Sequence, residues 1–212
     1  MPDLLPSSAE LPQLPPQAFR RRDEAPDAEF YHFERLVTHI DAAAVAAVTQ
    51  LYRQLLPPGG DLLDLMSSWV SHLPPEVPYG RVAGLGMNED ELAHNPRLTE
   101  RLVQDLNQQP ELPYPDESFD AAVCCVSVQY LTQPVAVFKS LLDVLRPGAP
   151  LVVTFSNRCF PDKAIYAWQT LDDAGHVRLV QHYFAAAGFQ NVQVFAHRPA
   201  YGDPLYGVVG LA

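Results

Sequence analysis

Residues 119–155 have the pattern of a strand, a helix and a second strand, and their sequence is FDAAVCCVSVQYLTQPVAVFKSLLDVLRPGAPLVVTF. The runs 119–128 and 151–155 are almost entirely apolar, as expected of strands that are covered on both faces in a parallel sheet. Between them, Pro134 suits the first turn of a helix, an apolar stripe follows at helical spacing, and Pro147-Gly148 ends it. The stretch therefore predicts a β-α-β unit, which normally has a right-handed crossover.

The chain before this unit predicts three more strands, in the short apolar runs 61–66, 81–86 and 102–106. A short helix is expected over 67–72, ahead of Pro74-Pro75, and another begins at Glu89. A longer helix starts after Asp41, whose carboxylate can cap it, and stops at Pro57-Pro58. Strands and helices thus alternate through the first half of the chain.

The C-terminal part predicts one more helix, which ends at Gly188, and two strands at 191–196 and about 205–211. A short loop joins these strands, so they are expected to pair antiparallel. The fold class is therefore α/β: a doubly wound, Rossmann-like, mostly parallel sheet with a C-terminal antiparallel hairpin and helices on both faces. Ligands of such folds bind at the C-terminal ends of the strands.

The N-terminus differs from the rest in composition, because six prolines lie within its first 30 residues. We assign residues 1–27 to a Pro-rich arm and 28–212 to the folded domain, with 28–56 as an N-terminal helical cap. The arm is either a disordered tail or a segment that drapes over the domain through its apolar side chains, namely Leu4, Leu5, Leu11, Leu14 and Phe19.

Composition narrows the classes of function. With 14 Lys+Arg against 25 Asp+Glu, the formal charge of −11 disfavours a nucleic-acid partner, which needs a basic face. No apolar run approaches the length of a membrane span and no signal peptide is visible, so we expect a soluble, cytoplasmic protein. The cysteines lack C-x-x-C spacing and the histidines lack ligand spacing, so no metal site is predicted.

Three features together point to a family: Asp64 near the end of the first strand, the stretch 112–120 before a buried strand, and 145–148 (LRPG) before another. Over about residues 35–212 the chain resembles the class I S-adenosylmethionine-dependent methyltransferases, in particular the small-molecule group that includes quinone-biosynthesis C-methyltransferases. The resemblance implies S-adenosylmethionine as cofactor and a small-molecule acceptor, methylated by in-line displacement.

The chain departs from the family where the cofactor is expected to bind. The positions of the family's glycine-rich turn match Met66, Ser68 and Val70, and the acidic residue that holds the ribose matches Gly86. By position, the resemblance implies a cofactor site made of Asp64, Met66, Ser67, Ser68, Trp69, Gly86, Met87, Asn88, Asp105, Leu106 and Ser127.

Three of these positions have alternative readings. Ser67 and Ser68 either hold the cofactor's carboxylate or cap the short helix that follows them. Asn88 either replaces the missing ribose carboxylate or caps the helix at Glu89. Asp105 either accepts from the adenine amino group, as the resemblance implies, or is an exposed loop aspartate.

The acceptor is expected at the mouth of the same crevice. Tyr130 is a candidate to orient the acceptor or take its proton, and Gln129 to bind a polar group of it. Aromatic and histidine residues are dense before the first long helix, which indicates either a lid over the pocket or ordinary core and surface residues. The candidates for substrate contact are Tyr31, His32, His72, Asn157 and Arg158.

Two functions remain open. The first is an enzyme that methylates a small molecule, and the second is a catalytically silent S-adenosylmethionine-binding or regulatory protein, which the lost glycines and the lost carboxylate would explain. A nicotinamide dehydrogenase is excluded because no G-x-G-x-x-G follows a strand. The acceptor atom and the oligomeric state do not follow from the sequence.

Overall fold

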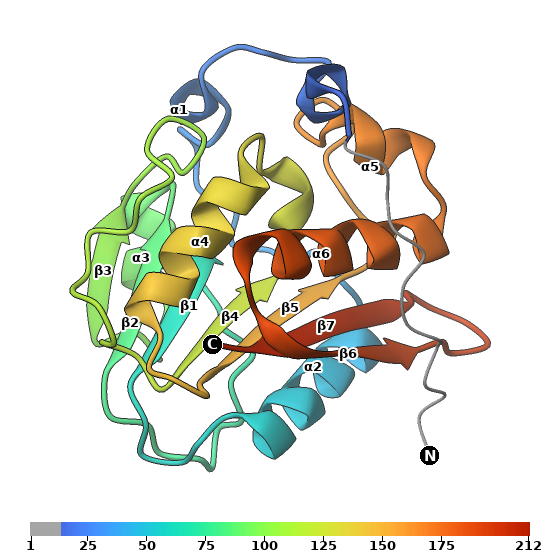
Figure 1. The fold of residues 1–212 in the computed structure, drawn as a ribbon. Coiled ribbons are helices and arrows are strands. Elements are labelled where there is room, and N and C mark those ends of the chain that lie inside the picture. The colour runs from blue at the N-terminus through green and yellow to red at the C-terminus, as the bar shows by residue number, and fades with distance from the viewer. Residues whose placement is uncertain (1–13) are drawn as a thin grey trace.

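The computed structural model describes residues 14–212, and Leu4, Leu5 and Leu11 of the predicted arm lie outside this range. A seven-stranded sheet with the order β3-β2-β1-β4-β5-β7-β6 forms its centre (Figure 1). The strands are β1 Leu62–Ser67, β2 Val82–Gly86, β3 Glu100–Val103, β4 Ala121–Cys125, β5 Pro150–Phe155, β6 Gln190–His197 and β7 Leu205–Leu211.

The strand directions confirm the predicted fold class. The strands β1 to β5 pair in parallel, whereas β7 runs antiparallel to both of its neighbours, β5 and β6. In β1, Leu62 pairs with Val82 of β2 on one side and with Ala121 of β4 on the other. The chain order reverses at β1, which leaves a crevice at the C-terminal ends of β1 and β4.

Helices cover both faces of the sheet, as predicted. The helices α4 (Pro134–Val144) and α6 (Asp173–Ala187) pack on one face, and α2 (Ala42–Leu55) packs on the other (Figure 1). The shorter helices are η1 Pro16–Phe19, α1 Asp27–Phe30, α3 Glu89–His94, η2 Val128–Tyr130 and α5 Tyr166–Thr170. Alternate residues of one strand serve the two cores: Leu63 faces α4 and α6, and Leu62 faces α2.

The helix ends use the predicted signals. The Asp41 carboxylate accepts a hydrogen bond from the Ala44 N–H at 2.9 Å at the start of α2. Gly188, with φ 107°, ends α6 in the left-handed conformation that favours glycine. No helix in the described part of the chain combines the length and the apolar character that a membrane crossing needs.

One predicted helix is absent, because the chain between β1 and β2 is an irregular loop, residues 68–81. Ser67 extends β1, and its neighbours form side-chain hydrogen bonds to distant residues instead of a helical turn. The Ser71 hydroxyl donates to Asp64 at 2.6 Å, and Asn95 donates to the Ser68 carbonyl at 2.8 Å. Side-chain bonds of this kind compete with helix formation, which corrects the expectation for 67–72.

The N-terminal segment lies against the domain from residue 14 onward. Leu14 and Phe19 pack against the hydrophobic core, and Ala18 of η1 is buried in it. The backbone is bonded to α5 as well, since the Tyr166 N–H donates to the Arg20 carbonyl at 2.7 Å. Over its described residues, the arm therefore drapes over the domain.

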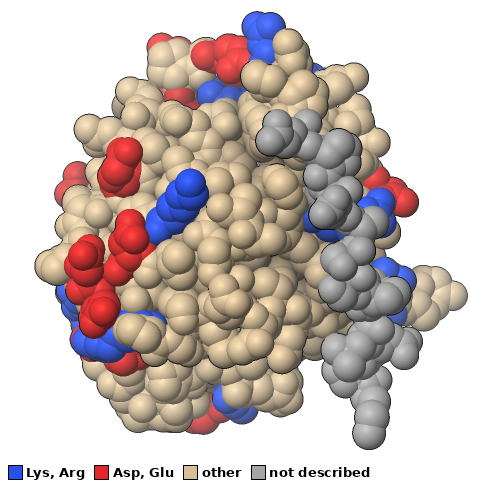
Figure 2. Space-filling model, in the orientation of Figure 1, with Lys and Arg blue, Asp and Glu red and all other residues tan. Residues whose placement is uncertain are grey.

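The face that carries α4 and α6 is largely uncharged. Figure 2 shows scattered basic side chains on this face and a small group of acidic ones toward one edge. Nucleic-acid binding draws on a continuous basic surface, and the described residues form none on this face.

Candidate functional site

A cleft opens at the C-terminal ends of β1, β2 and β4, beneath the segment 27–39. This is the crevice that the strand order leaves beside β1. Its lining includes Asp27, Tyr31, Arg35, His39, Asp64, Met66, Ser67, Ser68, Trp69, His72, Gly86, Met87, Glu91, Asp105, Leu106, Ser127, Tyr130 and Phe160.

Backbone strain is concentrated in this cleft. Among the described residues, five non-glycine residues have positive φ, and three of them line the cleft: Met66 at 54°, His72 at 53° and Val126 at 46°. A left-handed conformation is least favourable for a β-branched residue such as Val126. Strained residues cluster at ligand sites because the surrounding structure holds them in place. The strain therefore supports a binding role for the cleft.

Met66 forms an irregularity at the end of β1, where the pairing with β2 shifts between Leu65 and Ser67. The left-handed conformation falls at the first of the three positions where the family has glycine, and neither Ser68 nor Val70 shares it. Replacing Ser68 by glycine therefore relieves no backbone strain. The turn after β1 has been rebuilt around a single strained residue.

This irregularity explains why no carboxylate stands at the end of β2. The Ser67 carbonyl points at Gly86 so closely that a Cβ atom there would collide with its oxygen. Backbone atoms cannot move aside as a flexible side chain can. The irregularity at the end of β1 therefore leaves no room for a side chain at position 86, where the resemblance would place a ribose carboxylate.

Gly86→Ala is expected to lower the free energy of unfolding by about 1–3 kcal/mol, the usual scale for overpacking. The control is Gly207→Ala in β7, where the nearest atom to an added Cβ is a methyl group of the Leu51 side chain at 3.3 Å. Urea denaturation of both variants measures the difference. Equal stability of the two variants would show that the Ser67 carbonyl does not block position 86.

Asp64 is buried at the base of the cleft and is bound by neutral donors. The hydroxyls of Ser67 and Ser71 both donate to its Oδ2 at 2.6 Å. Burial raises the pKa of this carboxyl to about 6, although the two hydrogen bonds act in the opposite direction. Ser67 thus holds Asp64 in place rather than capping a helix.

Glu91 brings a carboxylate to the cleft that sequence reasoning missed. Its Oε2 accepts from the Ser68 hydroxyl at 2.6 Å, and its Oε1 accepts from the Arg35 N–H at 2.7 Å. The available signal was the position of Glu91 three residues after Asn88, the spacing of a capping box, which places a carboxylate in the first turn of α3. Sequence alone did not indicate that this turn faces Ser68.

Asn88 is the N-cap of α3 and does not line the cleft. Its Oδ1 accepts from the Glu91 N–H at 3.0 Å. Its Nδ2 donates to the carbonyls of Tyr31 at 2.9 Å and His32 at 3.3 Å. Both ends of the amide are therefore occupied by protein partners, and the predicted capping role is confirmed.

Asp105 follows β3 at the far end of the cleft, where Leu106 also lines the wall. Its Oδ1 accepts from the Asn107 N–H at 2.9 Å, and its Oδ2 accepts from Gln108 Nε2 at 2.8 Å. The carboxylate is half-buried and is oriented by neutral donors. Met87, Trp69 and Ser127 line the same cleft, and the Trp69 indole N–H donates to the Val37 carbonyl at 3.0 Å.

Of the two predicted catalytic residues, Tyr130 lines the cleft and Gln129 does not. The Tyr130 hydroxyl reaches the cleft wall and accepts from the Phe160 N–H at 2.9 Å, and burial raises its pKa to about 12, which disfavours the phenolate near neutral pH. Gln129 is fully buried, lies outside the cleft and donates to the Val126 carbonyl at 2.8 Å. The η2 turn directs Gln129 into the protein, which corrects its predicted contact with the acceptor.

Of the predicted substrate contacts, Tyr31 and His72 line the cleft and the other three do not. His32 is exposed on the outer side of its segment, and Asn157 is also exposed. Arg158 points away, toward Asp203, with Nε and Oδ1 2.9 Å apart. The loop after β5 contributes Phe160 to the cleft instead, and the segment before α2 contributes Arg35 and His39.

No cluster of three or more metal-binding side chains occurs among residues 14–212. The chemistry that the cleft offers is that of carboxylates, aromatic rings and imidazoles. Arg35 is the guanidinium among its lining residues, and it stacks over the Phe30 ring at 4.6 Å.

Comparison with known proteins agrees with this geometry. Residues 69–153 match the family described as a methyltransferase domain. The chain is 27% identical over 115 residues to the biotin biosynthesis bifunctional protein BioHC of Teredinibacter turnerae. That alignment covers 49% of this chain but only 20% of the relative, so the chain spans a small part of that protein's length.

The fold is shared with solved structures at low identity. A possible histamine N-methyltransferase from Thermotoga maritima, described as S-adenosylmethionine-dependent, has a TM-score of 0.58 at 18% identity, covering 79% of this chain and 89% of that chain. The [4+2]-cyclase SpnF has a TM-score of 0.58 at 16% identity, covering 78% and 80%. Phosphoethanolamine N-methyltransferase 2 of Haemonchus contortus, solved with S-adenosylmethionine, has a TM-score of 0.58 at 11% identity, covering 80% and 52%.

Proposed function

The chain carries a methyltransferase domain on the fold of the class I S-adenosylmethionine-dependent methyltransferases, and from this premise we propose that the cleft binds S-adenosylmethionine and directs its methyl group to a small molecule. The cofactor, when bound, supplies an electrophilic methyl group on a sulfonium. The protein then has to hold this group in line with the acceptor and exclude water.

One observation carries the proposal: three carboxylates line the cleft without a cationic partner. Within residues 14–212, Asp64, Glu91 and Asp105 are held by neutral hydroxyl, amide and backbone donors, and none of the three takes part in an ion pair. Three carboxylates without a direct ion-pair partner outnumber the one guanidinium of the described lining, Arg35, and this excess of negative charge favours a cationic ligand. S-adenosylmethionine meets this requirement, because its sulfonium and ammonium outweigh its one carboxylate.

Each of the three carboxylates is assigned to one part of the cofactor, according to its position along the cleft. Asp105, with the Leu106 N–H, is proposed for the adenine. Glu91 is proposed for the ribose hydroxyls, in place of the carboxylate that Gly86 cannot carry. Asp64 is proposed for the methionine ammonium, since its pKa near 6 leaves it ionised at neutral pH.

The silent binding protein remains the alternative. The rebuilt turn argues against simple decay, because Ser67, Ser68 and Ser71 each bind a named carboxylate at 2.6 Å. The likeness to a cyclase shows that this fold also carries other chemistry, so the fold does not assign the reaction. Methylation of an acceptor in the presence of S-adenosylmethionine separates the two functions.

Calorimetric titration with S-adenosylhomocysteine tests the binding site. Asp105→Ala is expected to weaken binding by about 1–3 kcal/mol, or roughly 5- to 150-fold, because a hydrogen bond to a charged group is lost. Asp116→Ala, in an exposed loop, is the control and should leave the affinity unchanged. Trp69 lines the cleft, so its fluorescence should respond to the ligand. Absence of both heat and fluorescence change with folded protein would contradict the proposed function.

A further inference from the structure

Arg35 brings a guanidinium to the cleft that the proposed cofactor site leaves unused. The residue lies on the segment between α1 and α2, and its backbone N–H donates to Glu91 Oε1 at 2.7 Å. Its guanidinium nonetheless forms no ion pair with Glu91, or with any other carboxylate within residues 14–212. Arginine in a cleft without an anionic partner is suited to bind the anionic group of a ligand.

Neutral contacts hold this guanidinium in place. Its Nη2 donates to the Phe30 carbonyl at 2.8 Å, and its Nη1 donates to the Phe33 carbonyl at 3.2 Å. The guanidinium carbon lies 4.6 Å from the centre of the Phe30 ring, 5.9 Å from that of Tyr31 and 5.7 Å from that of Phe160. Its Nε–H has no partner among the described residues and is not fully buried. The guanidinium is therefore preorganised, with N–H groups left for a ligand.

The rings beside Arg35 belong to the part of the cleft that the proposed cofactor does not use. Phe160 follows β5, and its ring stacks against that of Tyr130, which follows β4, with centroids 5.9 Å apart. Phe160 also meets the Phe30 ring edge-on at 5.3 Å. The carboxylates proposed for the cofactor lie instead on β1, on α3 and after β3. The guanidinium thus lies against an aromatic wall beside the cofactor site, and such a wall favours a flat ring.

The charge of the cleft permits an anion at this position. Bound S-adenosylmethionine would bring a sulfonium and an ammonium, which offset part of the negative charge of the lining. An anion on Arg35 would contact the guanidinium directly, and this contact outweighs the charge of carboxylates that lie beyond it, because ionic attraction falls with distance. The planar fork of a guanidinium matches the two oxygens of a carboxylate. Arg35 is therefore suited to a carboxylate in particular.

Resting on the proposed function, we propose that the acceptor is an aromatic carboxylate and that Arg35 is the specificity-determining residue that binds its carboxylate. The carboxylate takes the N–H groups that the carbonyls of Phe30 and Phe33 leave free, while the ring of the acceptor packs against Phe160 and Tyr130. A neutral amide of the same shape lacks the charge and presents a donor to the guanidinium. The cleft should therefore discriminate between a carboxylate and its amide.

Two fluorescent probes of the same shape test this discrimination. One is 2-aminobenzoate, and the other is 2-aminobenzamide, in which a neutral amide replaces the carboxylate. Both are titrated at neutral pH into protein saturated with S-adenosylhomocysteine. The benzoate should bind about tenfold more tightly or better, and added salt should weaken the binding of the benzoate alone. Equal affinities, or no binding of the benzoate, would overturn the proposal.

Variants of Arg35 locate the source of the discrimination. Arg35→Gln should lower the affinity for the benzoate about tenfold or more and leave that for the amide within about twofold. Arg35→Lys keeps the charge and loses the planar fork, so its loss should be intermediate. This lysine variant also decides the question if Arg35→Gln does not fold, and wild-type affinity of Arg35→Lys for the benzoate would then overturn the bidentate pair.

Arg97→Gln is the matched control, because Arg97 has the same kinds of contact outside the cleft. Arg97 is half-buried, donates to the carbonyls of Pro75 and Val77, and lies 5.5 Å from the centre of the Tyr79 ring. The substitution removes the same charge and should leave the affinities for both probes unchanged. An equal loss of benzoate affinity in Arg97→Gln and Arg35→Gln would show that only the overall charge of the protein matters, which would overturn the proposal.

Titration of the same variants with S-adenosylhomocysteine separates this inference from the proposed function. Arg35→Gln should keep its affinity for S-adenosylhomocysteine within about twofold of wild type, since the inference places Arg35 on the acceptor. If wild type does not bind S-adenosylhomocysteine, the proposed function fails and this inference with it. If Arg35→Gln weakens S-adenosylhomocysteine binding instead of benzoate binding, Arg35 holds the carboxylate of the cofactor. If it weakens both probes alike, Arg35 only supports the aromatic wall. Either of these two results overturns the acceptor assignment alone.

Discussion

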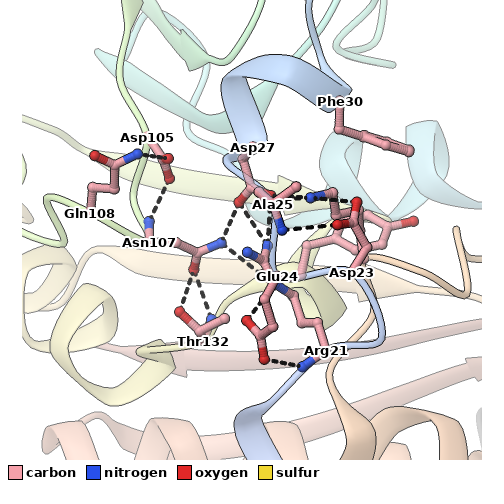
Figure 3. Close-up of polar contacts among 12 residues, drawn as sticks. Arg21, Asp23, Glu24, Ala25, Asp27, Phe30, Asp105, Asn107, Gln108 and Thr132 are labelled. Atoms are coloured by element: carbon pink, nitrogen blue, oxygen red, sulfur yellow. Dashed lines mark hydrogen bonds and ion pairs between the residues drawn. The ribbon is translucent and has the colours of Figure 1, made fainter.

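Asp27→Ala is expected to lower the free energy of unfolding by about 3–5 kcal/mol, because it leaves buried cations without their carboxylate. The side chains of Arg21, Asp27 and Lys163 are 7%, 5% and 1% exposed. Arg21 NH1 lies 2.7 Å from both carboxylate oxygens, and Lys163 Nζ lies 3.3 Å from Oδ1. Figure 3 shows the side chains of Arg21 and Asp27 among the polar contacts of this segment.

The same carboxylate connects the N-terminal segment to the cleft. Asn107 Nδ2 donates to Asp27 Oδ2 at 2.8 Å, and the Asn107 N–H donates to Asp105 (Figure 3). The Asn107 Oδ1 accepts from Thr132 at 2.7 Å, so Asn107 is held on three sides. Loss of Asp27 should therefore loosen the adenine end of the proposed cofactor site as well as the arm.

Urea denaturation of Asp27→Ala measures the effect. Glu29→Ala is the control, because Glu29 is exposed on α1 and forms no ion pair with another described residue; a change within about 0.5 kcal/mol is expected there. Removal of residues 1–25 should also destabilise the protein, since it deletes Arg21 and the Asp23 carboxylate 3.0 Å from Lys163. A truncated protein with an unchanged melting temperature would show that the arm is only a tail.

Asp64→Asn is expected to stabilise the unliganded protein and weaken cofactor binding. Burial raises the pKa of Asp64 from 3.8 to about 6, so the folded state favours the protonated form. This group supports folding fully below pH 3.8, and its contribution is lost as the pH rises through 6. Above pH 6 the variant should be more stable than wild type by about 2–3 kcal/mol, because asparagine still accepts from Ser67 and Ser71 without a buried charge.

Whereas the stability of Asp64→Asn should rise, its affinity for the cofactor should fall. S-adenosylhomocysteine affinity of Asp64→Asn should fall roughly 10- to 100-fold, since a charge-assisted hydrogen bond to the ammonium is lost. Wild-type affinity should fall below pH 6 as Asp64 becomes protonated, and the variant should lack this dependence. Urea denaturation at pH 4 and pH 8, with calorimetry, measures both effects, and Asp116→Asn serves as the exposed control. A variant that is less stable than wild type at pH 8 would show that the ionised carboxylate stabilises the fold.

The order of strands and helices followed from local pattern. The runs 119–128 and 151–155 are almost entirely apolar, as expected of strands that are covered on both faces. Asp41 and Gly188 marked helix ends through chemistry within their own turn. These features depend on neighbours a few residues away, so they could be predicted from the sequence, as could the position of the crevice.

The content of the crevice depended on partners far along the chain. The loop 68–81 is not a helix because Ser68 and Ser71 bond to Glu91, Asn95 and Asp64, and position 86 is glycine because the Ser67 carbonyl occupies its space. Gln129 turns inward, and His39 meets Phe160 from more than a hundred residues away. Periodicity reports which face of an element is buried. Periodicity carries no information on which side chain from elsewhere in the chain packs against that face. Those contacts form only in the tertiary structure, where the sheet, the turn after β1 and the N-terminal segment pack together.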